Sequence, residues 1–335
     1  MLAQASAPPR DVQKLSDMMR DGASPRSTRW AAPHPLAGIL LKSAAVLTFS
    51  LMFGLVKHLG HTYPVGELVF ARSFFAMVPI VLMVYARPER WQAIRTQRPW
   101  GHVLRASAGL IGMIFNFLTL TLLPLGDAMA ISFLAPLILV GLAPFLLHEH
   151  VGRIRVSAAV IGFLGVMIVA APHAAIVQGG DVSPWGVASG FVAAFCVAIA
   201  QILLRAMGLT EKPLATVFWF TLTTTIASAV ALPFGFVMPG VVDFMLLVLC
   251  GLLGGVAQFL ITESYRHADA SLLAPFDYLA LPISLVLGLA VFHEIPTAYS
   301  LTGGVVIMAS GLFIALRERA LWRRQGRVPV AAPEV

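Results

Sequence analysis

Residues 109–128 read GLIGMIFNFLTLTLLPLGDA, and residues 251–270 read GLLGGVAQFLITESYRHADA. The two segments share a Gly-x-x-Gly start, a Phe-Leu pair and an Asp-Ala end at a constant spacing of 142 residues, and Asn116 aligns with Gln258. Further along the chain, His148-Glu149 is repeated as His293-Glu294 at a spacing of 145 residues. This self-similarity indicates that one structural unit occurs twice.

The composition places both units in a lipid bilayer. Of 335 residues, 58% are hydrophobic and only 12% are charged, which is about half the charged share of a soluble domain. A helix needs about 20 mainly apolar residues to cross a membrane. Ten runs of this kind predict ten spans, at residues 36–57, 66–86, 103–123, 128–147, 155–172, 184–206, 213–236, 243–264, 270–292 and 297–316.

Ten spans divided between two copies give five spans to each copy. Because five is odd, the second copy must begin on the opposite side of the membrane from the first. We therefore expect an all-α membrane protein made of two inverted five-helix repeats, at residues 36–171 and 184–317, between a disordered cytoplasmic tail (1–35) and a second cytoplasmic tail (318–335). Inverted repeats are typical of secondary transporters with a site between the halves.

The basic residues give the orientation. Arginines gather in both tails and in the even-numbered loops, for example Arg87, Arg90, Arg95 and Arg98, whereas the odd-numbered loops have almost none. Lys57 is the exception, and we expect it to reach the membrane interface by snorkelling. The bias predicts that both termini are cytoplasmic. It also explains the net charge of +7 without a nucleic-acid partner.

Two longer stretches resemble a known family. They are RASAGLIGMIFNFLTLTLLPLGDAMAISFLAPLILVGLAPFLLHEHVG (105–152) and HADASLLAPFDYLALPISLVLGLAVFHE (267–294). Both are similar to the paired EamA-type domains of the drug/metabolite transporter superfamily, in the Asp-Ala start and the apolar run that ends in His-Glu. The resemblance implies a ten-span carrier of the bacterial inner membrane.

The resemblance leaves the cargo open, because such carriers move amino acids, nucleobases, polyamine-like compounds, riboflavin or S-adenosylmethionine. We favour a planar or aromatic cargo such as riboflavin. The alternatives are an amino-acid-like compound or S-adenosylmethionine, export of drugs or metabolites, and a structural membrane subunit that transports nothing. The last alternative requires neither inverted repeats nor charges inside the membrane.

Two charged residues lie deep inside predicted spans. Arg72 is in the second span, where an arginine costs about 2.5–3.5 kcal/mol unless it faces protein or water. Asp277 lies in the ninth span beside Tyr278 and between two prolines that interrupt the helix. Interrupted spans in matching positions of two halves point to a transporter site. We expect Asp277 to accept a proton or bind a cationic group and Arg72 to bind a carboxylate; the alternative is that both only join helices.

Other polar and aromatic positions are weaker candidates. Asn116 and Gln258 either line a central cavity or hydrogen-bond between helices. Trp219 lies inside a span although tryptophan favours the interface, and Trp219 and Tyr278 either stack on the cargo or pack in the protein. Lys42 is expected to snorkel to the cytoplasmic face.

The sequence does not contain the residue patterns expected of an enzyme, a metal-binding protein or an ATP-driven transporter. Cys196 and Cys250 are far apart, and His148-Glu149-His150 has no third ligand at a suitable spacing. We therefore expect no catalytic residue, no metal and no cofactor, and the missing GxxxxGK[ST] motif argues against direct ATP coupling. The expected partners are a small-molecule substrate, the bilayer and protons as a coupling ion. Gly186 and Gly190 form a GxxxG pattern that serves either packing within the bundle or a homodimer.

Overall fold

A computed structural model describes residues 35–86, 88, 90–146, 153–174, 184–207, 211–230, 232–268 and 270–324. These residues form helices joined by short loops, and no strand occurs in this part of the chain. The elements of the first half are α2 (Pro35–Leu59), α3 (Val65–Tyr85), η1 (Arg90–Ile94), α4 (Pro99–Leu122), α5 (Leu125–Ser132), α6 (Leu134–Leu146) and α7 (Arg153–Ala174). Those of the second half are α8 (Pro184–Met207), α9 (Pro213–Ala229), η2 (Leu232–Phe234), α10 (Val241–His267), α11 (Ala270–Leu273), η3 (Ala274–Leu279), α12 (Ala280–Phe292) and α13 (Ala298–Arg324).

The helices reproduce the predicted spans with two differences in length. Within the described residues, nine helical segments are long and apolar enough to cross a membrane, and α9 adds a shorter apolar helix of 17 residues. The seventh span was expected to reach residue 236, but α9 ends at Ala229, because prolines and glycines at 233, 235, 239 and 240 do not continue a helix. The last helix instead extends beyond the predicted span, to Arg324.

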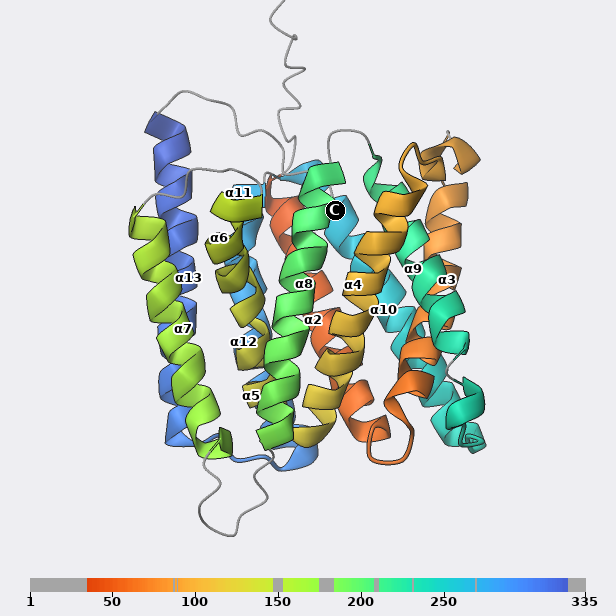
Figure 1. Cartoon of the computed structure of the whole chain (residues 1–335). Coiled ribbons are helices and arrows are strands. Elements are labelled where there is room, and N and C mark those ends of the chain that lie inside the picture. The colour runs from red at the N-terminus through yellow and green to blue at the C-terminus, as the bar shows by residue number, and fades with distance from the viewer. Residues whose placement is uncertain are drawn as a thin grey trace, which may run out of the picture. The chain divides into compact units, whose positions relative to one another are not determined.

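The packing of the helices shows the internal repeat. With α2 matched to α8, α3 to α9, α4 to α10, α5–α6 to α11–α12, and α7 to α13, the main contacts between helices have counterparts in the other half. The pair α4 and α8 corresponds to α10 and α2, and the pair α6 and α8 corresponds to α12 and α2. The pairs α3–α9 and α7–α13 each join an element to its own counterpart, and the pair α5–α12 joins the fourth span to the ninth (Figure 1). The fold is therefore two inverted five-helix repeats that interlock, and the interface between them runs through the bundle.

Glycines let the repeats approach closely. A Cβ atom at Gly251 or Gly255 of α10 would lie 2.9 or 2.8 Å from the backbone carbonyls of Ala71 or Ala76 on α3. On α8, Gly186 lies against Leu123 and Gly190 lies against Ile131. The GxxxG pattern is therefore used for packing inside this chain.

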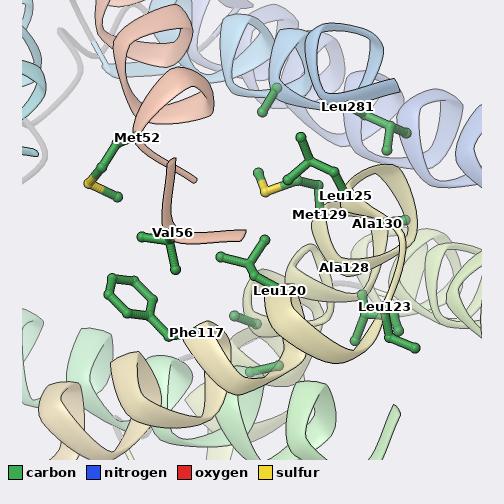
Figure 2. Close-up of a cluster of buried hydrophobic side chains, with 14 of the residues drawn as sticks. Met52, Val56, Phe117, Leu120, Leu123, Leu125, Ala128, Met129, Ala130 and Leu281 are labelled. Atoms are coloured by element: carbon green, nitrogen blue, oxygen red, sulfur yellow. The ribbon is translucent and has the colours of Figure 1, made fainter. Parts of the chain in front are cut away.

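The core lies where α2, α4, α5 and α12 meet. Met52 and Val56 of α2 face Phe117 and Leu120 of α4, and Leu125 begins α5 beside them (Figure 2). Large apolar side chains are also exposed on the outside of the helices, for example Val286 of α12 and Val305 of α13 at 65% and 66% exposure. An apolar surface of this kind is suited to lipid rather than water.

Candidate functional site

The fourth and ninth spans are both interrupted near their middle. The fourth is divided into α5 and α6 at Phe133, and the ninth changes to a 3-10 helix, η3, before α12 begins. The rings of Phe133 and Tyr278 stack with their centroids 5.0 Å apart and their planes at 18°. These residues are 145 positions apart, which is the spacing of the repeat at His148 and His293. The two breaks are thus equivalent positions that meet between the halves.

Lys42 and Asp277 form an ion pair beside this stack. The Nζ atom of Lys42, on α2, lies 2.7 Å from Oδ1 of Asp277, on η3; the lysine side chain is 3% exposed and that of Asp277 is 46% exposed. The ammonium also donates a hydrogen bond of 3.5 Å to the hydroxyl of Tyr265, on α10. The pair joins the first repeat to the second and keeps one open carboxylate at the break. The expectation that Lys42 snorkels to the surface is wrong, because Asp277 neutralises the ammonium inside the bundle.

A second buried ion pair joins the same two spans at their other end. Lys57, at the end of α2, lies 2.8 Å from Oε1 of Glu294, just after α12. The lysine also donates to the carbonyl of Leu123 at 2.6 Å, and Oε2 of Glu294 accepts the Leu125 amide at 2.8 Å. Lys57 is 5% exposed, so it is held by Glu294 rather than snorkelling as expected. Glu149, the counterpart of Glu294, lies outside the described residues.

Arg72 does not belong to the Lys42–Asp277 cluster. It lies on α3 and is 8% exposed. Its Nε atom is 3.1 Å from the Cβ position of Gly254, which also lies 3.0 Å from the sulfur of Met52. Met52 is ten residues beyond Lys42 on α2, a rise of about 15 Å. Arg72 and Asp277 therefore cannot bind the carboxylate and the ammonium of one amino-acid group together.

Asn116 and Gln258 occupy equivalent, partly exposed positions on α4 and α10. Gly112, one turn before Asn116, packs on Val197 of α8, and Gly254, one turn before Gln258, packs on Met52 of α2. Both amides thus lie near the seams where one repeat meets the other. Their role in binding stays a prediction.

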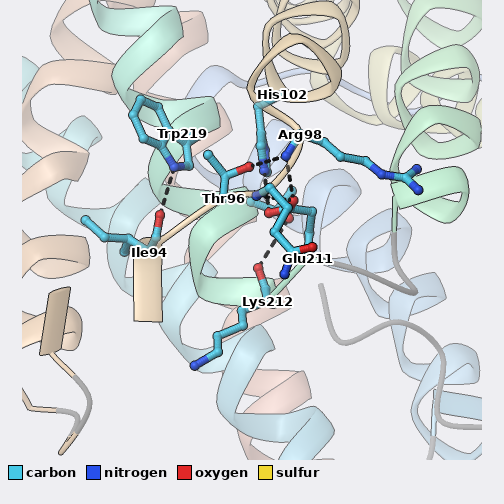
Figure 3. Close-up of polar contacts among 9 residues, drawn as sticks. Ile94, Thr96, Arg98, His102, Glu211, Lys212 and Trp219 are labelled. Carbon is cyan, nitrogen blue, oxygen red and sulfur yellow. Dashed lines mark hydrogen bonds and ion pairs between the residues drawn. The ribbon is translucent and has the colours of Figure 1, made fainter. Parts of the chain in front are cut away.

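Trp219 lies in a different polar cluster, on the side predicted to be cytoplasmic. Its indole N–H donates to the carbonyl of Ile94 at 2.9 Å (Figure 3). Nearby, Glu211 accepts hydrogen bonds from the backbone amides of Gln97 and Arg98 and lies 3.0 Å from Nε2 of His102 (Figure 3). These contacts join α4 and its preceding loop to α9, across the two repeats.

The charge of Glu211 is stabilised in this cluster. Burial tends to raise the pKa of Glu211, but hydrogen bonds from His102, from the Gln97 amide and from Thr96 outweigh this effect and hold the pKa below its usual range. Glu211 is therefore an ionised acceptor that connects the two repeats.

Two residues of the interior were not among the predicted site residues. Lys42 was expected at the interface, and Arg105 was not among the candidates. Arg105 reaches inward, where its guanidinium carbon lies 4.3 Å from the ring centroid of Phe220, on α9. Lys42 could have been recognised from its depth, because it lies about two turns inside α2 and a lysine at that depth needs a partner.

Inverted repeats of five spans, with interrupted helices and buried ion pairs between the halves, define a membrane carrier for small molecules. The chain belongs to the EamA-like transporter family, whose pattern matches residues 36–171 and 184–316. It is therefore a small-molecule transporter and a multi-pass membrane protein, not an enzyme.

Named relatives lie within the same family. The S-adenosylmethionine uptake transporter of Rickettsia bellii is 30% identical over 263 residues, which cover 78% of this chain and 88% of the relative. The riboflavin transporter of Rhizobium johnstonii is 30% identical over 227 residues, covering 68% and 73%. A crystal structure 19% identical in sequence shares the fold with a TM-score of 0.62, over 85% of this chain and 98% of the other.

Proposed function

We propose that this transporter carries a zwitterionic metabolite with an aromatic ring system, of the S-adenosylmethionine type. The observation that supports this proposal is the Lys42–Asp277 ion pair at the break of the ninth span. An ion pair offers both charges of a zwitterion, since Asp277 binds an ammonium and Lys42 binds a carboxylate. Four of the relatives are named S-adenosylmethionine uptake transporters.

Aromatic rings complete the proposed site. Lys42 Nζ lies 5.3 Å from the centroid of the Tyr265 ring. Tyr278, which follows Asp277 in the sequence, stacks on Phe133. Aromatic faces attract sulfonium and ammonium cations and stack on flat heterocycles. A cargo that bears a sulfonium, an amino acid and an adenine would use each of these groups.

The two ion pairs between α2 and the ninth span support a mechanism of alternating access. Lys42 and Lys57 are 15 residues apart on α2, a rise of about 22 Å. Each pair closes one end of the contact between the repeats. In this proposal the cargo displaces Lys42 from Asp277 and opens that end, while the Lys57–Glu294 pair holds the other end closed; the next step reverses the two. The protein would lie in the inner membrane with both termini cytoplasmic, and protonation of Asp277 would couple transport to a pH gradient.

Riboflavin is the second candidate cargo. The stacked rings of Phe133 and Tyr278 would suit a flat isoalloxazine, and relatives from Rhizobium johnstonii and Vibrio cholerae are named riboflavin transporters. Riboflavin has no ammonium or carboxylate, so it would leave the Lys42–Asp277 pair intact. The two cargoes therefore differ in their need for Asp277.

Uptake into proteoliposomes distinguishes them. Labelled S-adenosylmethionine and labelled riboflavin are each supplied to the wild-type chain, to Asp277→Asn and to the surface control Arg266→Gln, with and without a pH gradient. We expect S-adenosylmethionine uptake by the wild type and by Arg266→Gln, and at least about a tenfold loss in Asp277→Asn. Uptake of riboflavin alone, unchanged in Asp277→Asn, would contradict the zwitterion proposal. If Asp277→Asn kept both the uptake and its dependence on the pH gradient, Asp277 would not be the residue that couples transport to protons.

A further inference from the structure

Two arginines lie together in the interior, away from the Lys42–Asp277 pair. Arg72 lies on α3 and Arg105 on α4, and these two helices pack against each other. Phe220 of α9 supports the Arg105 guanidinium from one side, and Gly254 of α10 leaves room for the Arg72 side chain. The arginines therefore lie where α3, α4, α9 and α10 pack against one another.

Three donor atoms of these guanidinium groups have no partner in the part of the chain that the structure describes. Nε of Arg72 and both Nε and Nη1 of Arg105 are buried and have no hydrogen-bond partner among the described residues. A buried cation without hydrogen bonds is strongly unfavourable.

The seven carboxylates whose side chains the structure describes all have partners other than these arginines. Each one has a different partner: Glu67 accepts the Val237 amide, and the others interact with a lysine, a histidine, a tyrosine or another arginine. Those other carboxylates are Asp127 with His173, Glu211 with His102, Asp243 with Tyr63, Glu263 with Arg266, Asp277 with Lys42 and Glu294 with Lys57. The positive charge in this interior is thus not balanced by the described part of the chain.

We propose that Arg72 and Arg105 bind a small oxyanion, a carboxylate or an inorganic oxyanion such as phosphate. The planar guanidinium presents paired N–H donors that match two oxygens of an oxyanion, and such charge-assisted hydrogen bonds are strong where water is excluded. An anion held there satisfies the open donors and removes the repulsion between the two arginines.

This site is separate from the proposed cargo site and does not depend on the identity of the cargo. Arg72 lies at Gly254 beside Met52, which is about 15 Å from Lys42 along α2. The ammonium and the carboxylate of an amino acid, in contrast, are joined to the same carbon atom. A cargo held by Lys42 and Asp277 therefore leaves the arginines to a different oxyanion. This oxyanion is supplied by the solution.

Thermal unfolding of the full chain in detergent tests the proposal. The buffer anion is the bulky sulfonate MES, which is replaced stepwise by acetate or by inorganic phosphate at constant ionic strength. Because a ligand of the folded state raises the unfolding temperature, we expect a saturable rise in the wild type. Arg72→Gln and Arg105→Gln should shift the half-saturating concentration at least about tenfold. Arg266→Gln, which removes an exposed arginine paired with Glu263, should respond like the wild type.

Two outcomes would overturn the proposal: a wild-type chain that shows no saturable rise, or variants that respond as the wild type does. Arg72→Lys and Arg105→Lys keep the charge but lose the paired donors, so they test the site even if the glutamine variants fail to fold. We expect both lysine variants to bind more weakly. S-adenosylmethionine added in MES tests the separation from the cargo site. Because its one carboxylate is assigned to Lys42, the rise that it causes should persist in Arg72→Gln, and a rise that disappears there would overturn the separate oxyanion site.

Discussion

Lys42 lies two turns inside α2, and Asp277 supplies the charge that keeps it there. Removal of one member of a buried ion pair leaves the other charge without compensation, whereas replacement of both by apolar groups is often neutral. The side chain of Asp277 is 46% exposed, so water can solvate this carboxylate and reduces the cost of leaving it without Lys42. At the residue scale, the pair is thus both a structural contact and the open charge of the proposed site.

A double-mutant cycle separates these two roles. We expect Asp277→Asn to lower the stability of the folded chain by about 1–3 kcal/mol, since Lys42 loses its partner in a partly hydrated site. Lys42→Met with Asp277→Leu should recover most of that loss but should not recover uptake. Thermal unfolding in detergent and proteoliposome uptake measure the two effects. A double variant that regained transport would show that the pair only joins helices.

The low pKa of Glu211 predicts that the stability of the folded chain depends on pH. Because its hydrogen bonds hold the pKa of Glu211 below its unfolded value, the ionised carboxylate stabilises the fold above that value and loses this contribution as the pH falls through the folded-state pKa. Wild type should therefore unfold at a higher temperature than Glu211→Gln at neutral pH, and the difference should shrink below about pH 4.5. A difference that stayed constant from pH 7 to pH 4 would contradict this account.

At the element scale, the fold depends on close helix crossings and on two broken helices. Gly251 and Gly255 allow α10 to lie directly on α3, and Gly311 of α13 leaves room for the ring of Tyr278. A side chain at position 311 would overlap the ring of Tyr278, which stacks on Phe133. Small residues therefore determine where the interrupted spans meet.

Gly255→Ala tests the crossing of α10 and α3. The new methyl group would overlap Pro79 and lie 2.8 Å from the Ala76 carbonyl, and overpacking of this kind costs about 1–3 kcal/mol. Gly141→Ala is the matched control, because its Cβ would meet nothing within 4 Å and alanine is the better helix former. We expect the unfolding temperature to fall in the first variant and to rise slightly in the second. Equal effects would mean that the crossing tolerates a wider spacing.

At the scale of the whole molecule, two inverted repeats share one interior. The ten spans could be predicted because each apolar run is continuous in the sequence, and the duplication could be predicted because the same motif occurs twice at a constant spacing. The partners of Lys42 could not be predicted, because Asp277 and Tyr265 are 235 and 223 residues away in the sequence and only the packing of the two repeats brings them close. The position of Arg72 relative to Asp277 likewise depends on helix packing, which no spacing in the sequence reveals.

The orientation of the whole molecule is a separate prediction. Single cysteines at exposed loop positions, His61→Cys and Gln92→Cys, lie in the first and second loops. The charge bias predicts that an impermeant maleimide labels position 61 from the outside of intact cells and labels position 92 only after lysis. The parent chain, with Cys196 and Cys250 inside helices, is the control. The opposite labelling pattern would reverse the predicted topology.

The central claim is that one repeat holds the carboxylate of the cargo through Lys42 and the other holds its ammonium through Asp277. The most direct measurement is the ratio of uptake of S-adenosylmethionine to that of its decarboxylated analogue, in the wild type and in Lys42→Met. We predict a wild-type preference of at least about tenfold for the carboxylated cargo, and a ratio near one in Lys42→Met, which retains Asp277. The same preference in both chains would contradict the account.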